Sequence, residues 1–400
     1  MAGVDADVLI VGGGPAGSST ACHLARKGLS VMVFDRQSFP RDKPCGEGIM
    51  PHGVRELDNL GVLGRISQEE RGWFRGIRYC VGDAQADGDF PELSGGYRQG
   101  LGVRRIVLDK AIRDTALALG VTYVESTSVE ALVEHEGLPV GLKTAERSYR
   151  GRFLVGADGN RSLTRKRLGL DVPPAKRRRY GVRAHFHYQD TSRVGEFVEV
   201  YVTPRGEIYT TPVGPHELLV ALLLEQSEME RFGGRLEAAF EEFIFGDPRL
   251  AARFSGGTRI SPVMAAGPLS SRSKRPITDG ALLVGDAAGF IDPITGEGIS
   301  IALFSARLAA EVIHSALQAS DVRVHNLVRY EIERRREMRN FVLMTEGLLW
   351  LSHFPRICHW VIKRLSRQPQ LFSTLLGINC GHNSFTDVRV TDVGQLLLGV

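Results

Sequence analysis

The sequence predicts an α/β protein in which an antiparallel sheet and a helical C-terminal segment are added to a β-α-β core. Three observations lead to this prediction. Residues 8–36 read as a buried strand, a glycine-rich turn, a helix and a second strand. Residues 181–265 alternate polar and apolar side chains in short runs, as antiparallel strands do. Residues 339–378 have a helical pattern rich in Leu, Trp, Phe and Ile, with Lys and Arg interspersed.

The overall composition is that of an ordinary globular protein. The 400 residues are 43% hydrophobic and 24% charged, and a net charge of +4 gives no reason to expect nucleic acid as a partner. The five cysteines are widely spaced, without a CxxC pair or a Cys/His cluster, so we expect reduced thiols and no metal. The N-terminus lacks a basic leader and no run of 18 apolar residues occurs. We therefore expect a cytoplasmic protein without a signal peptide or a transmembrane helix.

The first strand, turn and helix contain a glycine motif typical of dinucleotide binding. In DVLIVGGGPAGSS, Gly12, Gly14 and Gly17 occupy the three glycine positions of GxGxxG. The first allows a tight turn, the second lets a pyrophosphate approach the backbone, and the third lets helix and strand pack closely. Asp35 ends the second strand at a spacing that suits a ribose hydroxyl of FAD or NAD. The cofactor residues predicted in this unit are Gly12, Gly14, Pro15, Ala16, Gly17, Asp35 and Arg36.

Three later segments complete a larger pattern. GVRRIVLDKAIRD has an Arg-x-x-Leu-Asp core that begins at Arg105, and GRFLVGADGNRS carries Asp158 after a strand. ALLVGDAAGFIDPITGEGIS joins a strand to an apolar helix through a loop with Asp286 and Pro293. Together with GxGxxG, these segments resemble the fingerprints of the para-hydroxybenzoate-hydroxylase-type flavoproteins. That superfamily includes aromatic-ring monooxygenases, flavin halogenases and geranylgeranyl reductases, and the resemblance covers about residues 6–310.

The resemblance implies FAD as the cofactor, held by two separate loops. In the family, the Asp of the GD motif, here Asp286, binds the ribityl chain, and the dipole of the following helix points at the flavin ring. The further cofactor residues that it implies are Cys45, Gly46, Arg105, Asp158, Gly285, Pro293, Gly296, Gly298 and Ile299. It also implies a Rossmann-type FAD-binding domain of residues 1–75, 100–175 and 276–320, an interleaved antiparallel-sheet substrate domain of residues 76–99 and 176–275, and a helical C-terminal cap of residues 321–400.

The segment FPRDKPCGEGIMPHG matches the reductase-like branch of the family and should lie against the flavin ring. No strong side-chain acid or base stands out, so the catalytic residues remain unknown. The candidates are Cys45, Glu47, His52 and Tyr209. Cys45 is either a functional wall of the site or a small apolar filler, and His52 is either a proton donor or an ordinary loop histidine. Four polar side chains alternate along the predicted strands, and some of these side chains would face the substrate cavity. They are Arg183, His185, His187 and Tyr209.

Two segments have alternative interpretations. The basic run AKRRRY, residues 175–180, is either a solvated linker or a contact for the phosphates of a pyridine nucleotide. Because no second GxGxxG occurs, NADH or NADPH would bind only transiently as a co-substrate. The apolar C-terminal helices would cap the substrate cavity, form ordinary core, or rest on a membrane surface as a peripheral contact. Each functional alternative implies a small lipophilic substrate.

The favoured function is an FAD-dependent monooxygenase that uses NAD(P)H and O₂ to hydroxylate or epoxidise a lipophilic aromatic or prenylated secondary metabolite. The alternative is a geranylgeranyl-reductase-like enzyme that hydrogenates isoprenoid C=C bonds. KPCGEG favours the reductase, whereas EIYTTPVG lacks the tryptophan of that branch's Tyr-x-Trp-x-Phe-Pro segment. A halogenase is disfavoured because its Trp-x-Trp-x-Ile-Pro signature is missing. A non-enzymatic prenyl-binding protein is disfavoured because Asp286, Pro293 and Gly296 are retained.

Overall fold

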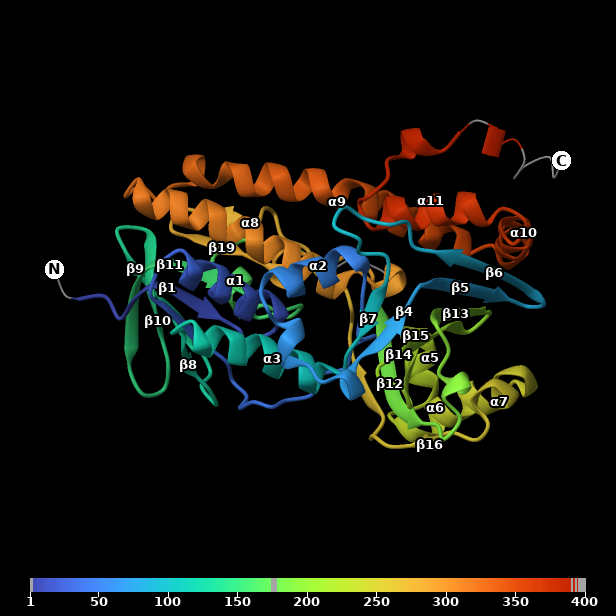
Figure 1. The fold of residues 1–400 in the computed structure, drawn as a ribbon. Helices are drawn as coiled ribbons and strands as arrows, with labels where there is room; N and C mark the ends of the chain where they lie inside the picture. The colour runs from blue at the N-terminus through green and yellow to red at the C-terminus, as the bar shows by residue number, and fades with distance from the viewer. Residues whose placement is uncertain (1–2, 174–177, 390, 393, 395–400) are drawn as a thin grey trace.

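The computed structural model describes residues 3–173, 178–389, 391–392 and 394. The first of its two large sheets contains the strands of the N-terminal glycine motif (Figure 1). The strand order is β18-β19-β11-β1-β2-β8, with β10 beside β11 and β9 beside β10. From β19 to β8 the neighbouring strands run parallel. The strands are β1 (Ala6–Val11), β2 (Val31–Phe34), β8 (Thr122–Val124), β9 (Ala131–His135), β10 (Leu138–Lys143), β11 (Ser148–Gly156), β18 (Ile277–Thr278) and β19 (Ala281–Leu283). β1 is buried on both faces, as its unbroken apolar run predicts.

Helices cover this sheet and form the main hydrophobic core with it. α1 (Pro15–Arg26) packs against both α3 (Arg105–Ala118) and α8 (Gly298–Gln318), and α8 also contacts α2 (Pro51–Asn59) and the long α9 (Val324–Ser352) (Figure 1). The short α4 (Leu163–Arg167) follows β11. Because β1, β11 and β19 are parallel neighbours, the loops that follow them leave the sheet at the same edge. This topology brings the glycine turn of residues 12–14 and the loop of residues 284–297 together.

The second large sheet is mainly antiparallel and has the order β16-β12-β15-β14-β13-β5-β6, with β17 also beside β12. Its strands are β5 (Gly76–Val81), β6 (Ala84–Asp89), β12 (Arg179–His187), β13 (Phe197–Thr203), β14 (Gly206–Pro212), β15 (Glu217–Glu225), β16 (Thr258–Arg259) and β17 (Met264–Ala266). A separate core of apolar side chains, including stacked Phe186 and Phe240, lies between this sheet and its helices. These helices are α5 (Gln226–Arg231), α6 (Leu236–Phe245) and α7 (Pro248–Phe254).

The C-terminal helices and a small third sheet lie next to the two large sheets and their helices. α10 (Pro355–Leu365) and α11 (Pro369–Asn379) pack on β5 and β6. The small sheet has the order β3-β7-β4, formed by β3 (Gly48–Ile49), β4 (Gly72–Phe74) and β7 (Gly100–Gly102). A Cβ atom at Gly72 or Gly102 would collide with the Pro212 carbonyl of β14, so both glycines are needed for this close contact. The short 3₁₀ turns are η1 (Leu63–Arg65), η2 (Gln68–Glu70), η3 (Thr191–Arg193), η4 (Gly285–Ala288), η5 (Pro293–Thr295) and η6 (Phe385–Asp387).

The structure confirms the predicted fold class: a Rossmann-type α/β unit, an interleaved antiparallel sheet and a helical C-terminal segment. Strands β5 and β6 belong to the second sheet although they precede α3 in the chain. We propose that the domain limits follow this division between the sheets.

Two local expectations are wrong. His52 does not lie in a loop but in the first turn of α2, because Pro51 has the backbone angle that starts a helix. In the basic run, residues 175–177 lie outside the described residues and Arg178 is exposed, but the solvated-linker interpretation is wrong for Arg179, which begins β12 and is only 3% exposed.

One helix among the described residues, α8, is long and apolar enough to cross a membrane by length and composition alone. However, 67% of its most apolar window is buried inside the protein, as in a core helix.

Candidate cofactor and active site

The first cofactor loop can be built only with glycine at two positions. Gly12 has a φ of +103°, and a Cβ atom there would collide with the carbonyl of Ala157 in the loop after β11. A Cβ atom at Gly17 would collide with the Gly12 carbonyl oxygen. α1 starts at Pro15, and no side chain caps its N-terminus at Gly14. The first backbone N–H groups of α1 therefore remain available to an anion such as a pyrophosphate.

A chain of alternating charges connects this loop to α3. Asp35 Oδ2 accepts a 2.8 Å hydrogen bond from the Gly13 N–H and faces Arg41 at 3.3 Å. Arg41 also pairs with buried Asp109 at 3.0 Å, and Arg105 donates two 2.8 Å hydrogen bonds to the same carboxylate. Arg105, which the family pattern assigns to the cofactor, thus directs its guanidinium at Asp109 and holds the network in place. Arg36, the next residue after Asp35, is exposed.

The second cofactor loop touches the first. Gly285 has a φ of +56°, and a Cβ atom added there would lie 2.8 Å from the Ala16 side chain. The partly exposed Asp286 carboxylate accepts no hydrogen bond from the described residues, although the charges of Lys43 and Arg334 lie near it. This carboxylate is therefore available to a ligand between the two loops.

The rest of the second loop leads into α8. Asp292 accepts a 3.0 Å hydrogen bond from the Ile294 N–H, and Pro293 starts the 3₁₀ turn η5. Gly296 then takes the left-handed conformation, with a φ of +70°. α8 begins at Gly298 without a side-chain cap from any described residue, and Ile299 in its first turn is buried. The uncapped start of α8 is a second place where backbone N–H groups are available to a partial negative charge.

Asp158, another residue that the family pattern assigns to the cofactor, has a structural role here. Its carboxylate accepts hydrogen bonds from the Ser162 hydroxyl at 2.5 Å and the Thr164 N–H at 2.9 Å. It thereby holds the loop between β11 and α4. Buried Arg165 on α4 donates to the Ala287 carbonyl at 3.2 Å, so this loop also supports the second cofactor loop.

Strands β12 and β14 of the second sheet cover the second cofactor loop and the segment before α2. The Thr211 hydroxyl donates to the Gly46 carbonyl at 2.9 Å, and the Tyr209 hydroxyl donates to the Ile294 carbonyl at 3.3 Å. Burial raises the pKa of Tyr209 well above its usual range, so the phenol stays protonated at neutral pH. The structure therefore brings the Cys45–Glu47 segment and Tyr209 to the same region.

Glu47 is the most constrained of the candidate residues. It is 1% exposed and has a φ of +58°, a conformation that costs a non-glycine residue about 1–3 kcal/mol. Its carboxylate accepts a 2.9 Å hydrogen bond from the Arg105 N–H and lies 2.7 Å from His185 Nε2. His185 Nδ1 lies 2.9 Å from the hydroxyl of partly exposed Ser261. Ser261, His185 and Glu47 thus form a continuous hydrogen-bonded path from the partly exposed Ser261 to the Cys45–Glu47 segment and the start of α3.

His52, the fourth catalytic candidate, contacts Glu297 and not the residues of the Ser261–His185–Glu47 path. Its Nε2 lies 3.3 Å from Glu297 Oε2. Burial raises the pKa of Glu297 well above its usual range and lowers the pKa of His52 to about 4. Both shifts disfavour the charged forms, because burial removes water from the carboxyl and the imidazole alike.

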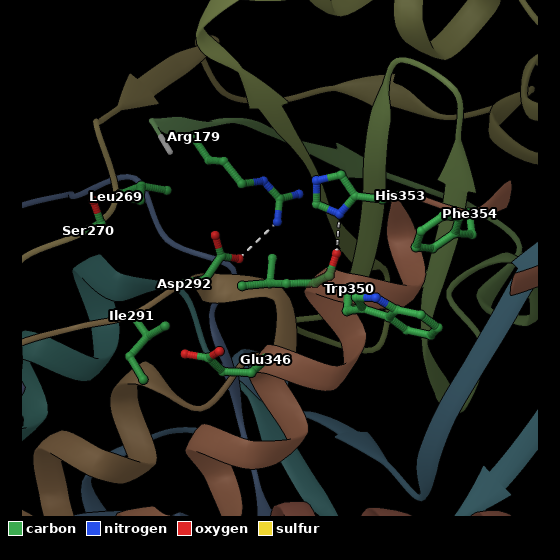
Figure 2. A pocket seen from close by; sticks show the side chains of 10 residues that line it. Arg179, Leu269, Ser270, Ile291, Asp292, Glu346, Trp350, His353 and Phe354 are labelled. Atoms are coloured by element: carbon green, nitrogen blue, oxygen red, sulfur yellow. Dashed lines mark hydrogen bonds and ion pairs between the residues drawn. The ribbon is translucent and has the colours of Figure 1, made fainter. Parts of the chain in front are cut away.

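A cavity of about 570 Å³ opens beside the second cofactor loop (Figure 2). Its polar end holds Arg179, which pairs with Asp292 at 2.9 Å and with buried Glu207. Its other wall is largely apolar and comes from α9 and the residues that follow it. Figure 2 shows Trp350 and Phe354 beside His353, whose ring contacts the Leu349 carbonyl at 2.6 Å. The lining residues are Arg179, Leu269, Ser270, Ile291, Asp292, Glu346, Leu349, Trp350, His353 and Phe354.

Sequence reasoning missed several of these residues. Arg41 and Lys43 lie in a segment without regular secondary structure, and although Lys43 belongs to the KPCGEG segment, neither residue was predicted as a site residue. His185 was one of four alternating strand residues, and Glu47 was a candidate, but their pairing was not predicted. The alternation along β12 was one signal that could have found His185, because residues two apart on a strand face the same side. Arg183 and His185 are both almost fully buried, and Arg183 pairs with Asp42 at 2.6 Å. His187, two residues further along β12, is only partly buried and stacks on His216 instead.

The chain belongs to the family of FAD binding domains, whose model matches residues 5–344, and it is an oxidoreductase of the FAD-dependent type. It is 30% identical to the menaquinone reductase of Mycobacterium tuberculosis, over 78% of this chain and 77% of that protein. It is 28% identical to the digeranylgeranylglycerophospholipid reductase of Methanocella arvoryzae, over 82% of each chain. A flavoprotein/dehydrogenase from Cytophaga hutchinsonii has the same fold, with a TM-score of 0.83, 21% identity, and coverage of 98% of this chain and 99% of that one.

The residues at the two loops fit FAD. Gly12 and Gly17 let the glycine turn pack closely, so that the uncapped start of α1 is available to a pyrophosphate, and the Asp286 carboxylate has no hydrogen-bond donor among the described residues. The start of α1 and Gly12–Gly14 would hold the pyrophosphate, Asp35 the adenosine ribose, Asp286 the ribityl chain, and the start of α8 the ring edge.

We expect Asp286→Asn to weaken FAD binding without destabilising the apoprotein. The substitution removes a charge-assisted hydrogen bond of roughly 1.5–3 kcal/mol, which corresponds to about a 10- to 150-fold higher Kd. Because no described residue donates to this carboxylate, the thermal midpoint of the apoprotein should stay unchanged. Fluorescence titration with FAD measures the effect, with Asp89→Asn, an exposed carboxylate on β6, as control. Equal FAD affinity of Asp286→Asn and the parent would show that this loop is misassigned.

Proposed function

We propose that the protein is an FAD-dependent monooxygenase that uses NADH or NADPH and O₂ to oxygenate a lipophilic aromatic or prenylated compound. The observation that carries this proposal is the cover of the second cofactor loop and the Cys45–Glu47 segment by β12 and β14, next to a cavity with a largely apolar wall. When bound, FAD supplies the redox chemistry, since it accepts a hydride from a nicotinamide and passes electrons to O₂. The chain's own part is to exclude water, position the substrate and move protons.

The Ser261–His185–Glu47 path supports proton movement in such a reaction. A phenol becomes more electron-rich, and so reacts faster with an electrophilic oxygen, when it loses its proton. His185 Nε2 and Glu47 Oε2, 2.7 Å apart, can exchange a proton, and Ser261 connects His185 to the surface. The phenol of Tyr209, which stays protonated, can hold a substrate oxygen by a hydrogen bond.

The second candidate is a reductase that hydrogenates C=C bonds of an isoprenoid lipid. The KPCGEG segment and the two curated relatives described above favour it. In this case Cys45 or Tyr209 would donate the proton that completes the reduction. The segment EIYTTPVG speaks against it, because Glu207 and Tyr209 stand where the reductase branch has its tyrosine and tryptophan. Here Glu207 forms a buried ion pair with Arg179 instead.

A lipophilic substrate fits the surface beside the cavity. Trp350, Phe354, Ile357 and Trp360, on α9, α10 and their connection, are 37–59% exposed, and the first two line the cavity. Helix α10 carries basic side chains as well as the exposed Ile357 and Trp360. We propose that the substrate enters here. Contact of this surface with a membrane stays a prediction.

The requirement for O₂ tests the proposed function. We expect NADH or NADPH oxidation by the FAD-loaded protein to accelerate with a lipophilic phenol, with about one O₂ consumed per nicotinamide and little H₂O₂ released. The measurement is parallel recording of absorbance and dissolved O₂, with and without catalase. Turnover that continues under argon, with a hydrogenated isoprenoid as product, would replace the monooxygenase by the reductase.

A further inference from the structure

Three side chains with metal-binding atoms converge at the end of the second cofactor loop. His52 lies in the first turn of α2, Glu297 immediately precedes α8, and Cys380 immediately follows α11. The imidazole, carboxylate and thiol donor atoms all lie within 4.8 Å of one another. Glu297 is 2% exposed and Cys380 is 6% exposed. Because the three residues come from distant segments, the expectation of no metal, which relied on local spacing, did not detect them.

The cluster contains buried polar atoms without a hydrogen-bond partner. Glu297 Oε1 accepts a 2.9 Å hydrogen bond from Asn379 Nδ2, which fixes the carboxylate. Glu297 Oε2, in contrast, lies 3.3 Å from His52 Nε2 without the geometry of a hydrogen bond to any described residue, and His52 Nδ1 has no hydrogen-bond partner among these residues. A buried carboxylate oxygen in this state is costly unless a further group binds it. The Oε2 atom points to the same region as His52 Nε2 and the Cys380 thiol.

A cavity of about 240 Å³ gives access to the cluster, and all three residues line it. The cavity has room for water, which would supply a further ligand to a bound ion. Two cationic side chains, Arg55 and Arg307, also line it. Arg307 is compensated by Glu56 at 3.2 Å and Glu311 at 3.3 Å, which limits its repulsion of a cation.

We propose that His52, Glu297 and Cys380 form a binding site for a divalent metal, best suited to Zn²⁺. Zinc prefers tetrahedral sets of thiolate, imidazole and carboxylate, and a water molecule from the cavity completes the set. Donor atoms in such a site are roughly 3.3–3.7 Å apart, so side-chain movements of about 1 Å bring the three residues into place. The bound ion ties the C-terminal helix α11 to the first turns of α2 and α8, and thereby holds the second cofactor loop. This site is independent of the reaction proposed above.

The test is zinc binding by the FAD-loaded full-length protein. After chelator treatment and gel filtration, the protein is titrated with Zn²⁺ against a chromogenic chelator, and the bound metal is counted by elemental analysis. We expect one Zn²⁺ per chain and a higher thermal midpoint with zinc. Cys380→Ser and His52→Gln should each weaken binding by at least about 100-fold, more than the 10- to 100-fold typical of outer partners. Asn379→Ala, an outer partner of Glu297, should have a smaller effect.

The control is Cys358→Ser, which removes another buried thiol that lies on α10 outside the cluster. This variant should bind zinc like the parent. The proposal is overturned if the parent binds no zinc, or if Cys380→Ser and Cys358→Ser bind it equally well. If Cys380→Ser does not fold, Glu297→Gln, which keeps the shape of the side chain, takes its place, and parental affinity of that variant overturns the proposal.

Discussion

Gly17→Ala is expected to yield a nearly colourless protein. The new Cβ atom would collide with the Gly12 carbonyl oxygen, so α1 must move away from the turn that holds the pyrophosphate. Overpacking of this kind costs about 1–3 kcal/mol. Since the displaced N-terminus of α1 also no longer points at the phosphates, we expect FAD binding to weaken roughly 10- to 100-fold or more.

The measurement is FAD content after gel filtration, followed by FAD titration of the apoprotein. The matched control is Gly347→Ala on α9, where a Cβ atom meets no other atom within 4 Å. Alanine is favoured over glycine in a helix, so this variant should be at least as stable as the parent and equally yellow. A Gly17→Ala protein that retains parental FAD content would contradict the assignment of the first loop.

Arg179→Met is expected to lower the free energy of unfolding by about 3–5 kcal/mol, because it leaves buried Glu207 without its cation. The effect should appear as a lower urea midpoint. Arg75→Met is the control, since Arg75 and its partner Asp89 are about half exposed and such a pair contributes only about 0–1 kcal/mol.

The double variant Arg179→Met/Glu207→Gln separates the buried charge from lost packing. Removal of the Glu207 charge should restore part of the stability, because the main cost of the single variant is an uncompensated carboxylate. Equal midpoints of the single and double variants would show that Arg179 acts through packing alone. Equal effects of Arg179→Met and Arg75→Met would show that the pair is no more important than a surface ion pair.

The backbone features of the cofactor loops could be predicted from the sequence because they depend on local constraints. Gly12, Gly17 and Gly285 sit where a Cβ atom clashes, and the residues between strand and helix set the turn. The role of Asp286 was implied by the resemblance of its GD motif to the family pattern, and its place at the edge where the parallel strands end agrees with that role. Each of these residues lies in a strand-loop-helix unit that the sequence marks, although the atoms that a Cβ at Gly12 or Gly285 would meet, in Ala157 and Ala16, come from other units.

The polar networks could not be predicted in the same way. The Glu47–His185 contact spans 138 residues, and it forms only because β12 of the second sheet lies over the segment before α2. The burial of Arg179 depends on Glu207 and Asp292, which come from β14 and the second cofactor loop. His52 illustrates the same limit, since its partner Glu297 belongs to a distant segment and only the fold brings them together.

The most direct test of the proposed function is the mass of the product after turnover under ¹⁸O₂. The FAD-loaded protein is incubated with NADH or NADPH and a lipophilic phenol or prenylated quinone, and the product is analysed by mass spectrometry. A monooxygenase places one labelled oxygen atom in the product, and a parallel reaction in H₂¹⁸O under ordinary O₂ leaves it unlabelled. A product that gains two hydrogen atoms and no labelled oxygen would contradict the monooxygenase and establish the reductase.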